Sequence, residues 1–571
     1  MKTNALHSPG PARGLFDTPS ALPQSSALGF FWPVLILLSA LLAFQPALHN
    51  RLTQDDVQQV QELSVPHDGA GWMRAAGAPW WPPARQKHLW RPLTRLSILA
   101  QKEWCGAALW SFYGFNILLH AAVALLLFAV AGRLGLRRGA AGAAALLFAV
   151  HPVHAEAVHQ VVGRAELFAA AFMLIGFLAF LKLGLKNPHT WWIQPLLFAG
   201  ALGAKEHAIV YPALLLLAAL AAPSDPDAPR RRWAVLGQRR FWGLMLVLGA
   251  VGAGFVGFRA AITGGILEPV STIPYHENPL AHLPFWSRLP ASLGVFGYAV
   301  SRLFWPAGLS PDYSAVSFPF GRGWAWAWSW IGLAGALAIL GYGIMNYRRG
   351  GRGWLLATAG AIGYGLIANG PLVIGVDLAE RLWYWPSAAA CLALGWGVGR
   401  VDERLNPGAR RTAVLGFGLA LVLLISAAWA DAPAWRSPKD YALATLRRFP
   451  QSWRAHVNLA RENYLEKDFE RGAQQARQAT SIFPNLAIGW DWLGVNAMFL
   501  PGDEREAEAA LRRSLALDPS LGETHRHLAN LLERLGRKAE AARELEAYLK
   551  FSEIADRSKV AERLERLQRQ P

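Results

Sequence analysis

The chain has 571 residues, of which 53% are hydrophobic, and its 56 Lys and Arg against 39 Asp and Glu give a formal net charge of +17. This apolar composition excludes an ordinary soluble enzyme and favours a membrane protein. The positive charge does not indicate nucleic-acid binding, because most arginines lie in short segments between long apolar runs, where membrane proteins concentrate them.

The first 27 residues contain Lys2 and Arg13 but no apolar run, and we expect them to be a disordered cytoplasmic N-terminus. The run that begins at Leu28 lacks a small-residue cleavage site, which predicts an uncleaved membrane helix. Residues 28–432 are the predicted transmembrane domain. Cys105 and Cys391 lie far apart within it, so no disulfide framework or thiolate metal site is indicated.

Twelve apolar runs in this domain are candidate membrane helices, since a bilayer core needs roughly 20 residues per helix. The all-α membrane bundle that they predict has helices near 29–48, 108–131, 139–152, 165–185, 191–204, 207–222, 241–262, 288–306, 324–346, 354–373, 382–399 and 412–430. The runs at 139–152 and 191–204 are short, as expected for helices that are tilted or broken at a cavity.

The arginine-rich connections at 133–138, 223–240, 347–352 and 400–411 predict the cytoplasmic side. This assignment leaves one run too many between 263 and 346, so we expect residues 288–306 to be re-entrant or interfacial. About eleven crossings follow, which places outer loops 49–107 and 151–164 and the C-terminal domain on one side. The Ala/Gly/Arg-rich composition indicates a bacterium, for which this side is the periplasmic face of the inner membrane.

Acidic and histidine residues are concentrated in the two outer loops. The first loop contains the pair Asp55-Asp56, which taken alone also fits two solvated acids. The second runs from His151 through His154, Glu156 and His159 to Gly163-Arg164-Ala165-Glu166. Ionisable groups at a bilayer edge are costly and indicate function. A histidine-based metal site is disfavoured, because Pro152 breaks the regular helix that an i, i+4 ligand pair requires.

Basic side chains recur where candidate spans meet the outer surface, at Arg91, Arg164, Lys205 and Arg381. Together they could bind a phosphate or pyrophosphate, and arginine is suited to bidentate contact. Simple extension of each side chain to the lipid headgroups is the alternative. The tryptophans Trp80, Trp81 and Trp90 are typical of interfacial anchors, with stacking on a sugar as the alternative.

The region 437–571 is polar and internally repetitive. Leu459-Ala460, Leu493-Gly494 and Leu528-Ala529 recur at intervals of 34 and 35 residues, and Pro450, Pro484 and Pro519 end units at the same interval. This is the tetratricopeptide period, which predicts an α-solenoid. Such a stack exposes a concave groove that usually holds a peptide or protein, although a purely structural cap is the alternative.

The motifs of the membrane region occur in the order of one known family. They resemble those of the transmembrane-and-tetratricopeptide O-mannosyltransferases, members of the GT-C superfamily, over nearly the whole chain. The matching segments are Asp55-Asp56, Arg91-Pro92-Leu93-Thr94, Asn116 with His120, His151-Pro152-Val153-His154-Ala155-Glu156-Ala157-Val158, Gly163-Arg164-Ala165-Glu166, Lys205-Glu206 and Glu380-Arg381-Leu382-Trp383-Tyr384-Trp385-Pro386-Ser387.

The resemblance implies an inverting glycosyltransferase that moves a sugar, mannose in that family, from a polyprenyl phosphate or pyrophosphate to an acceptor hydroxyl on a protein. It implies that Asp55 or Asp56 is the general base. The other roles follow by analogy: Glu156 and His154 position the acceptor or leaving group, Arg91, Arg164, Lys205 and Arg381 bind the donor phosphate, and His151, Glu206 and Tyr384 contact acceptor or sugar.

No metal is required on this scheme. The related oligosaccharyltransferases use a divalent cation held by acids in the same loops, so Mg²⁺ or Mn²⁺ held by Asp55, Asp56 and Glu156 is the alternative. Two rival functions also fit the sequence. One is a non-catalytic scaffold that recruits partners for envelope assembly, and the other is a transporter of lipid-linked sugars.

Overall fold

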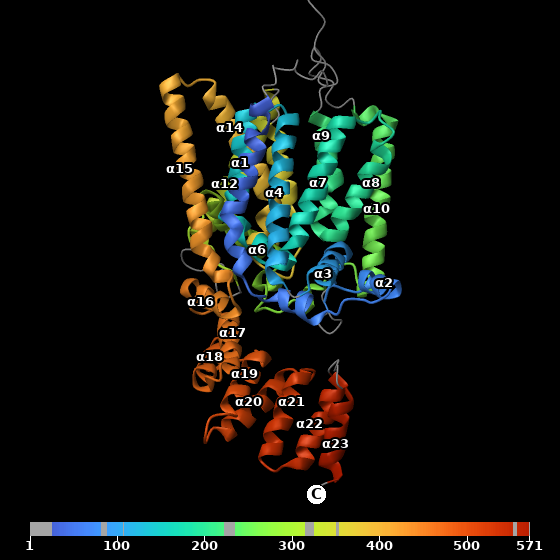
Figure 1. The fold of residues 1–571 in the computed structure, drawn as a ribbon, viewed down its shortest axis with the longest axis vertical. Coiled ribbons are helices and arrows are strands. Elements are labelled where there is room, and N and C mark those ends of the chain that lie inside the picture. The colour runs from blue at the N-terminus through green and yellow to red at the C-terminus, as the bar shows by residue number, and fades with distance from the viewer. Residues whose placement is uncertain are drawn as a thin grey trace, which may run out of the picture. The chain divides into compact units, whose positions relative to one another are not determined.

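The computed structural model describes residues 26–81, 88–106, 108–221, 235–313, 325–349, 353–551 and 557–569. These residues form helices and no β-strand, which confirms the predicted all-α class. They divide into two compact units (Figure 1). The membrane unit contains described residues up to 309 and from 325 to 433, and the repeat unit contains 310–313 and 434 onward. Most of the predicted N-terminal segment 1–27 lies outside the described residues.

The membrane unit is a helical bundle whose breaks coincide with the polar motifs. Its longer helices are α1 (Ser26–Phe44), α3 (Pro92–Cys105), α4 (Leu109–Arg133), α5 (Arg138–Val150), α7 (Arg164–Leu183), α8 (Thr190–Ala204), α9 (Tyr211–Ala221), α10 (Arg239–Thr263), α11 (Phe285–Phe304), α12 (Ala325–Arg348), α13 (Gly353–Gly365), α14 (Tyr384–Asp402) and α15 (Pro407–Asp431). Between them lie shorter pieces: η1 (Gln45–His49), η2 (Val57–Glu62), α2 (Gly69–Gly77), η4 (Pro152–His154), α6 (Ala155–His159), η5 (Val161–Gly163), η6 (Glu206–Val210), η8 (Val270–Thr272), η9 (Pro279–His282) and η10 (Glu380–Trp383). The short helix η11 (Ala432–Trp435) follows α15 and includes the boundary between the two units.

Six helices of the described part of the chain are long and apolar enough to cross a membrane. The pair Arg138–Val150 and Pro152–His159, bent by 51°, is a seventh if it counts as one span. Helix α8 has 15 residues, so it is about 22 Å long, which is shorter than a hydrocarbon core of about 30 Å. The expected eleven crossings are therefore not confirmed, because several of the predicted runs form short helices.

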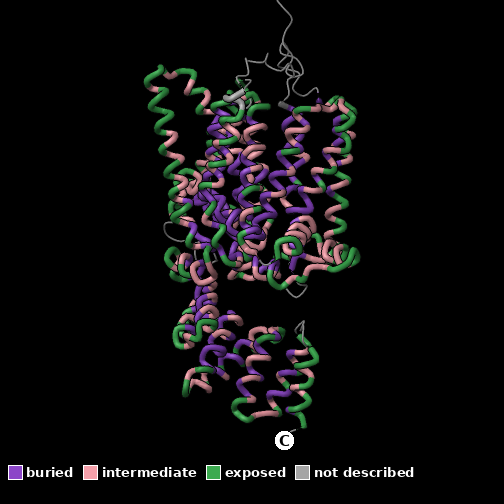
Figure 2. The backbone as a smooth tube through the Cα atoms, viewed as in Figure 1, coloured by how far each residue is buried: buried purple, intermediate pink, exposed green. Residues whose placement is uncertain are grey.

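The outer surface of the membrane unit is apolar. Leu246 in α10 and Leu415 in α15 are 76% and 74% exposed, whereas the residues where α4, α5 and α7 meet are buried (Figure 2). Exposed apolar side chains on this scale would be costly in water and are ordinary in lipid. The chain is a membrane protein.

The repeat unit consists of paired helices, as the sequence period predicts. They are α16 (Pro438–Arg448), α17 (Trp453–Leu465), α18 (Phe469–Ile482), α19 (Ala487–Ala497), α20 (Glu504–Leu517), α21 (Gly522–Arg534), α22 (Lys538–Phe551) and α23 (Arg557–Arg569). In each repeat, the carbonyl oxygen of the recurring proline forms a hydrogen bond with a ring nitrogen of the residue six positions later. The pairs are Pro450 with His456 Nε2 (3.0 Å), Pro484 with Trp490 Nε1 (2.8 Å) and Pro519 with His525 Nε2 (3.1 Å).

A segment from between α11 and α12 also belongs to the repeat unit. The Tyr441 hydroxyl donates to the Pro311 carbonyl at 2.7 Å, and Arg454 Nη1 donates to Asp312 Oδ1 at 2.9 Å. The Tyr313 ring packs 5.7 Å from that of Phe449. The sequence did not predict this addition to the solenoid.

Candidate active site

The two adjacent aspartates of the first outer loop have different surroundings. Asp56 is fully buried, where Oδ2 accepts from the Val161 N–H at 2.9 Å and Oδ1 from the Val162 N–H at 2.8 Å. Its carboxyl group therefore joins the first outer loop to η5. Burial raises the pKa of Asp56 to about 7, and the neighbouring Asp55 adds to this effect while the two backbone hydrogen bonds oppose it.

Asp55 is only partly buried, and no described residue forms a hydrogen bond or ion pair with its carboxylate. It follows Gln54, whose φ of 48° is in the left-handed region that non-glycine residues seldom adopt. Such strained backbone persists where surrounding contacts hold it, and it is common at active sites. Asp55 is thus an accessible carboxylate on a loop that the buried Asp56 holds in place.

The histidines of the second outer loop lie in the protein interior. His154 is fully buried, and its Nε2 is 2.8 Å from Ser387 Oγ on α14. His151 accepts from the Val153 N–H through Nδ1 and bonds to the Leu303 carbonyl of α11 through Nε2, at 2.9 Å. These contacts fix the bend between α5 and α6 against neighbouring helices.

Tyr384 belongs to the same buried cluster. Its hydroxyl is 2.8 Å from His120 Nδ1, and its ring centroid is 4.9 Å from that of His154. The acceptor or sugar contacts predicted for His151 and Tyr384 stay predictions, and the structure gives both side chains partners inside the bundle.

Glu156 connects α6 to η10. Its Oε2 accepts from the Arg381 backbone N–H at 2.8 Å, and its Oε1 pairs with the guanidinium of the same residue. The two residues are 225 positions apart, so the fold brings together two motifs that the sequence treats separately.

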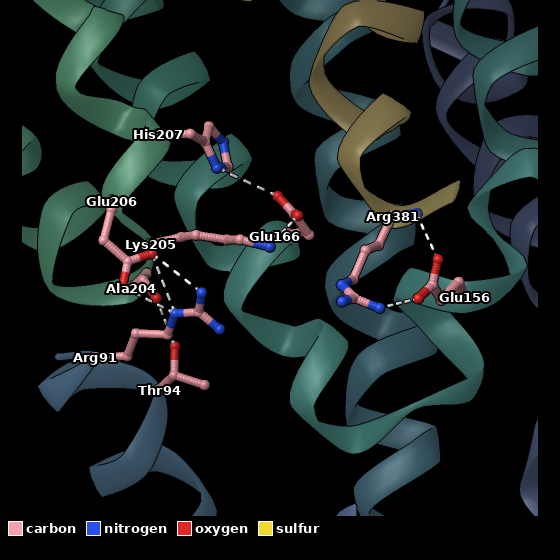
Figure 3. A network of polar contacts seen from close by, with 9 residues as sticks. All are labelled: Arg91, Thr94, Glu156, Glu166, Ala204, Lys205, Glu206, His207 and Arg381. Carbon is pink, nitrogen blue, oxygen red and sulfur yellow. Dashed lines mark hydrogen bonds and ion pairs between the residues drawn. The ribbon is translucent and has the colours of Figure 1, made fainter. Parts of the chain in front are cut away.

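A second group of charges surrounds the junction of α8 and η6 (Figure 3). Lys205 pairs with Glu166 of α7, and His207 Nδ1 lies 3.4 Å from the other oxygen of that carboxylate. Arg91 contacts both Glu206 oxygens, with Nη2 to Oε2 at 3.1 Å. Arg91 directly precedes Pro92, the first residue of α3.

Three of the four predicted phosphate ligands lie near one another. Arg91 and Arg381 both act electrostatically on Lys205, and Figure 3 shows Arg381 between Glu156 and the Lys205–Glu166 pair. Each of the three cations already pairs with a carboxylate. The network therefore contains several charges of both signs, and its net charge is close to zero. The pairing of each cation with a carboxylate offsets the desolvation cost of burying these ionic groups.

The fourth predicted ligand, Arg164, is fully buried and saturated. Nε donates to Asn116 Oδ1 at 3.0 Å, Nη1 to the carbonyl and hydroxyl oxygens of Ser97, and Nη2 to Gln101 Oε1 at 2.6 Å and the Phe112 carbonyl. All five N–H groups thus have protein acceptors. Its role in phosphate binding stays a prediction, and any anion would have to displace one of these contacts.

The alternative cation site does not fit this arrangement. Both oxygens of Asp56 accept backbone N–H groups, and both oxygens of Glu156 contact Arg381. The described residues contain no group of three or more His, Cys, Asp or Glu side chains placed to hold a metal ion.

Sequence reasoning did not assign roles to Glu166 and His207, although Glu166 lies inside a motif that it singled out and His207 directly follows one. Glu166 ends the Gly163-Arg164-Ala165-Glu166 segment, and His207 follows Lys205-Glu206. Their proximity in space was hidden because 40 residues, which include most of α7 and all of α8, separate them along the chain.

Several curated proteins are similar in sequence to this chain. It is 27% identical to protein O-mannosyl-transferase Tmtc1 of Drosophila melanogaster over 77% of this chain and 55% of that protein. It is 31% identical to Tmtc2 of the same organism over 46% of this chain and 28% of that protein. It is also 26% identical to TMTC3 of Mus musculus, over 76% and 49%. All three of these relatives are named protein O-mannosyl-transferases.

The predicted resemblance to the O-mannosyl-transferases is thereby confirmed. The chain spans about half the length of the O-mannosyl-transferases that it matches over most of its own length. No family model matches the sequence. Among solved structures, yeast Tom70 matches at 12% identity with a TM-score of 0.22 over 70% of this chain and 89% of that one, too low to support any structural conclusion.

Proposed function

We propose that this chain is an inverting glycosyltransferase of the GT-C type. It transfers a sugar, mannose by relation to the O-mannosyl-transferases, from a polyprenyl-phosphate lipid to an acceptor hydroxyl on a protein. The observation that carries the proposal is the placement of Asp55: a partly exposed carboxylate without a described partner, on a strained loop that buried Asp56 fastens to η5.

Asp55 is the general base in this scheme. The acceptor oxygen attacks the anomeric carbon as its proton passes to the Asp55 carboxylate, and the bond from that carbon to the phosphate oxygen breaks. The polyprenyl phosphate leaves with the electron pair. Asp56 is a positioning residue, because both of its oxygens are occupied by the Val161 and Val162 N–H groups.

Arg91, Lys205 and Arg381 would receive the negative charge that develops on the phosphate. Arg91 pairs with Glu206, Lys205 with Glu166 and Arg381 with Glu156. When the donor binds, a phosphate oxygen therefore replaces a carboxylate as the partner of a cation. Before the donor binds, Glu206 and Glu156 thereby keep the side chains of Arg91 and Arg381 in position. His151, His154 and Tyr384 support this region from the buried side of η4 and α6.

The repeat unit would present the protein acceptor on the outer side of the membrane, the periplasmic side in a bacterium. Chain connectivity supports this side. Ser310–Tyr313 and the residues from Ala434 onward form one compact unit, so an even number of crossings must separate them. The proposed side also requires that α11, which precedes residue 310, does not cross the membrane.

The test is transfer of radiolabelled sugar from polyprenyl-phosphate mannose to an acceptor peptide by the purified chain, with and without a chelator. Asp55→Asn should lower turnover by about 10²- to 10⁴-fold, the usual contribution of a general base. Glu62→Gln, an exposed carboxylate in the same loop, is the matched control and should retain activity.

Full activity of Asp55→Asn would refute its role as the base. Loss of activity with chelator would mean that a metal takes part. If the wild-type chain transfers sugar from no polyprenyl-phosphate donor while Asp55→Asn still replaces the native gene in cells, the scaffold is the better account.

A further inference from the structure

The pair formed by Glu166 and His207 has an unexplained feature. The Glu166 carboxylate lies between the Lys205 ammonium and the His207 ring, with His207 Nδ1 3.4 Å from Oε2 (Figure 3). The other ring nitrogen, Nε2, is buried, and no described residue forms a hydrogen bond with it. Native structures rarely leave such a nitrogen unpaired, and each exception calls for an explanation, such as a functional role or a bound water or ion.

The chemistry of the pair determines what Nε2 can bind. An ionised carboxylate only accepts hydrogen bonds, so the proton of the neutral imidazole belongs on Nδ1, facing Glu166. Nε2 then carries a lone pair and no hydrogen. The esterified phosphate of a donor lipid offers only acceptor oxygens, which a lone pair cannot bind, whereas a hydroxyl group can donate to it.

We propose that His207 Nε2 accepts a hydrogen bond from a hydroxyl of the donor sugar, and that Glu166 holds the imidazole in the required tautomer and orientation. This inference rests on the proposed function. Lys205 pairs with the opposite oxygen of the same carboxylate, so the groups for the phosphate and for the sugar share Glu166. His207 is a specificity-determining residue, and it distinguishes a sugar-bearing lipid from the bare lipid phosphate.

The experiment measures the dissociation constants of two probes, polyprenyl phosphate and polyprenyl-phosphate mannose, with the purified full-length chain in detergent. The wild-type chain should prefer the sugar-bearing lipid. His207→Leu should lose about five- to tenfold of that preference, the usual worth of one hydrogen bond, while its affinity for polyprenyl phosphate stays unchanged.

His207→Gln carries an amide oxygen near the position of Nε2 and should retain most of the preference. The matched control is His67→Leu, at an exposed histidine of the first outer loop, which should behave as wild type. Thermal unfolding midpoints show whether each variant folds, and His207→Ala replaces the leucine variant if the latter does not.

Equal weakening of both lipids by His207→Leu would overturn the inference, because it would indicate a phosphate contact or a purely structural ring. So would an unchanged preference in that variant. If the wild-type chain binds neither lipid, the proposed donor class itself fails. If it binds both lipids with equal affinity, the donor class stands and the inference about His207 is overturned.

Discussion

Asp55 and Asp56 are neighbours in the chain, yet the fold assigns them different chemistry. The sequence predicts that one of them is a base and leaves the choice open. The choice depends on the N–H groups of Val161 and Val162, which are more than a hundred residues away and occupy both oxygens of Asp56. Contacts of such long range are invisible in a local motif, so the pair could be predicted and the individual role could not.

The raised pKa of Asp56 makes stability depend on pH. Burial raises it from 3.8 to about 7, so the folded chain holds a proton that the unfolded chain releases in this window. The resulting stabilisation is complete below about pH 4 and is lost as the pH rises through 7. Between pH 4 and 7 the unfolding midpoint of the wild-type chain should fall relative to that of Asp56→Asn. Parallel profiles would contradict this, and Glu62→Gln should follow the wild type.

A substitution of Arg164 can distinguish a structural role of this residue from a role in binding the donor phosphate. Its five N–H groups all have protein acceptors, and lysine can satisfy only three of them, in a different geometry. Arg164→Lys should lower the free energy of unfolding by about 2 kcal/mol, since it leaves buried acceptors unpaired. Arg133→Lys, at an exposed position of α4, is the control. Unchanged stability with weaker binding of polyprenyl phosphate would instead favour the phosphate role.

The sequence predicted two interruptions among the helices of the membrane unit, but it did not predict the contacts between separate helices. Pro152 marked a broken helix, and the structure bends there by 51°. The run at 191–204 was recognised as short, and α8 has 15 residues. The hydrogen bond from His151 to Leu303 and the pairing of Glu156 with Arg381 join separate helices. The sequence around each of these residues contains no pattern that predicts its partner.

The turn between α6 and α7 depends on the absence of a side chain at Gly163. A Cβ there would lie 2.2 Å from the Ala157 carbonyl oxygen, a backbone atom that cannot simply swing away. Gly163→Ala should therefore cost about 1–3 kcal/mol, as overpacking does, and move η5 away from Asp56, with loss of turnover. Gly132→Ala, which meets nothing within 4 Å, should be neutral or slightly stabilising. Chemical unfolding of the two variants measures the difference, and equal midpoints would contradict it.

At the scale of the whole molecule, the sequence predicted a membrane region followed by a repeat region, and the structure divides the chain near residue 433. The period of 34 and 35 residues was sufficient for this, because each helix pair repeats the same contacts. Inclusion of Ser310–Tyr313 in the repeat unit was not predictable, since four residues between two apolar helices carry no repeat signal.

Topology can be checked by labelling single cysteines in a background with Cys105→Ser and Cys391→Ala. Ser64→Cys in the first outer loop and Ser520→Cys in the repeat unit should react with an impermeant maleimide from the same side of the membrane. Arg411→Cys, in an arginine-rich connection, should react only after permeabilisation. All three positions are exposed. Labelling of Ser64→Cys and Ser520→Cys from opposite sides would refute the proposed arrangement.

The contribution of residues 310–313 to the solenoid also dictates an order of events during biosynthesis. At 5–20 residues per second, Tyr441 leaves the ribosome roughly 10 s after Pro311, its hydrogen-bond acceptor. Throughout that interval residues 310–313 lack the partners that Tyr441 and Arg454 supply in the folded chain. A product truncated before residue 441 would leave these four residues without those contacts permanently.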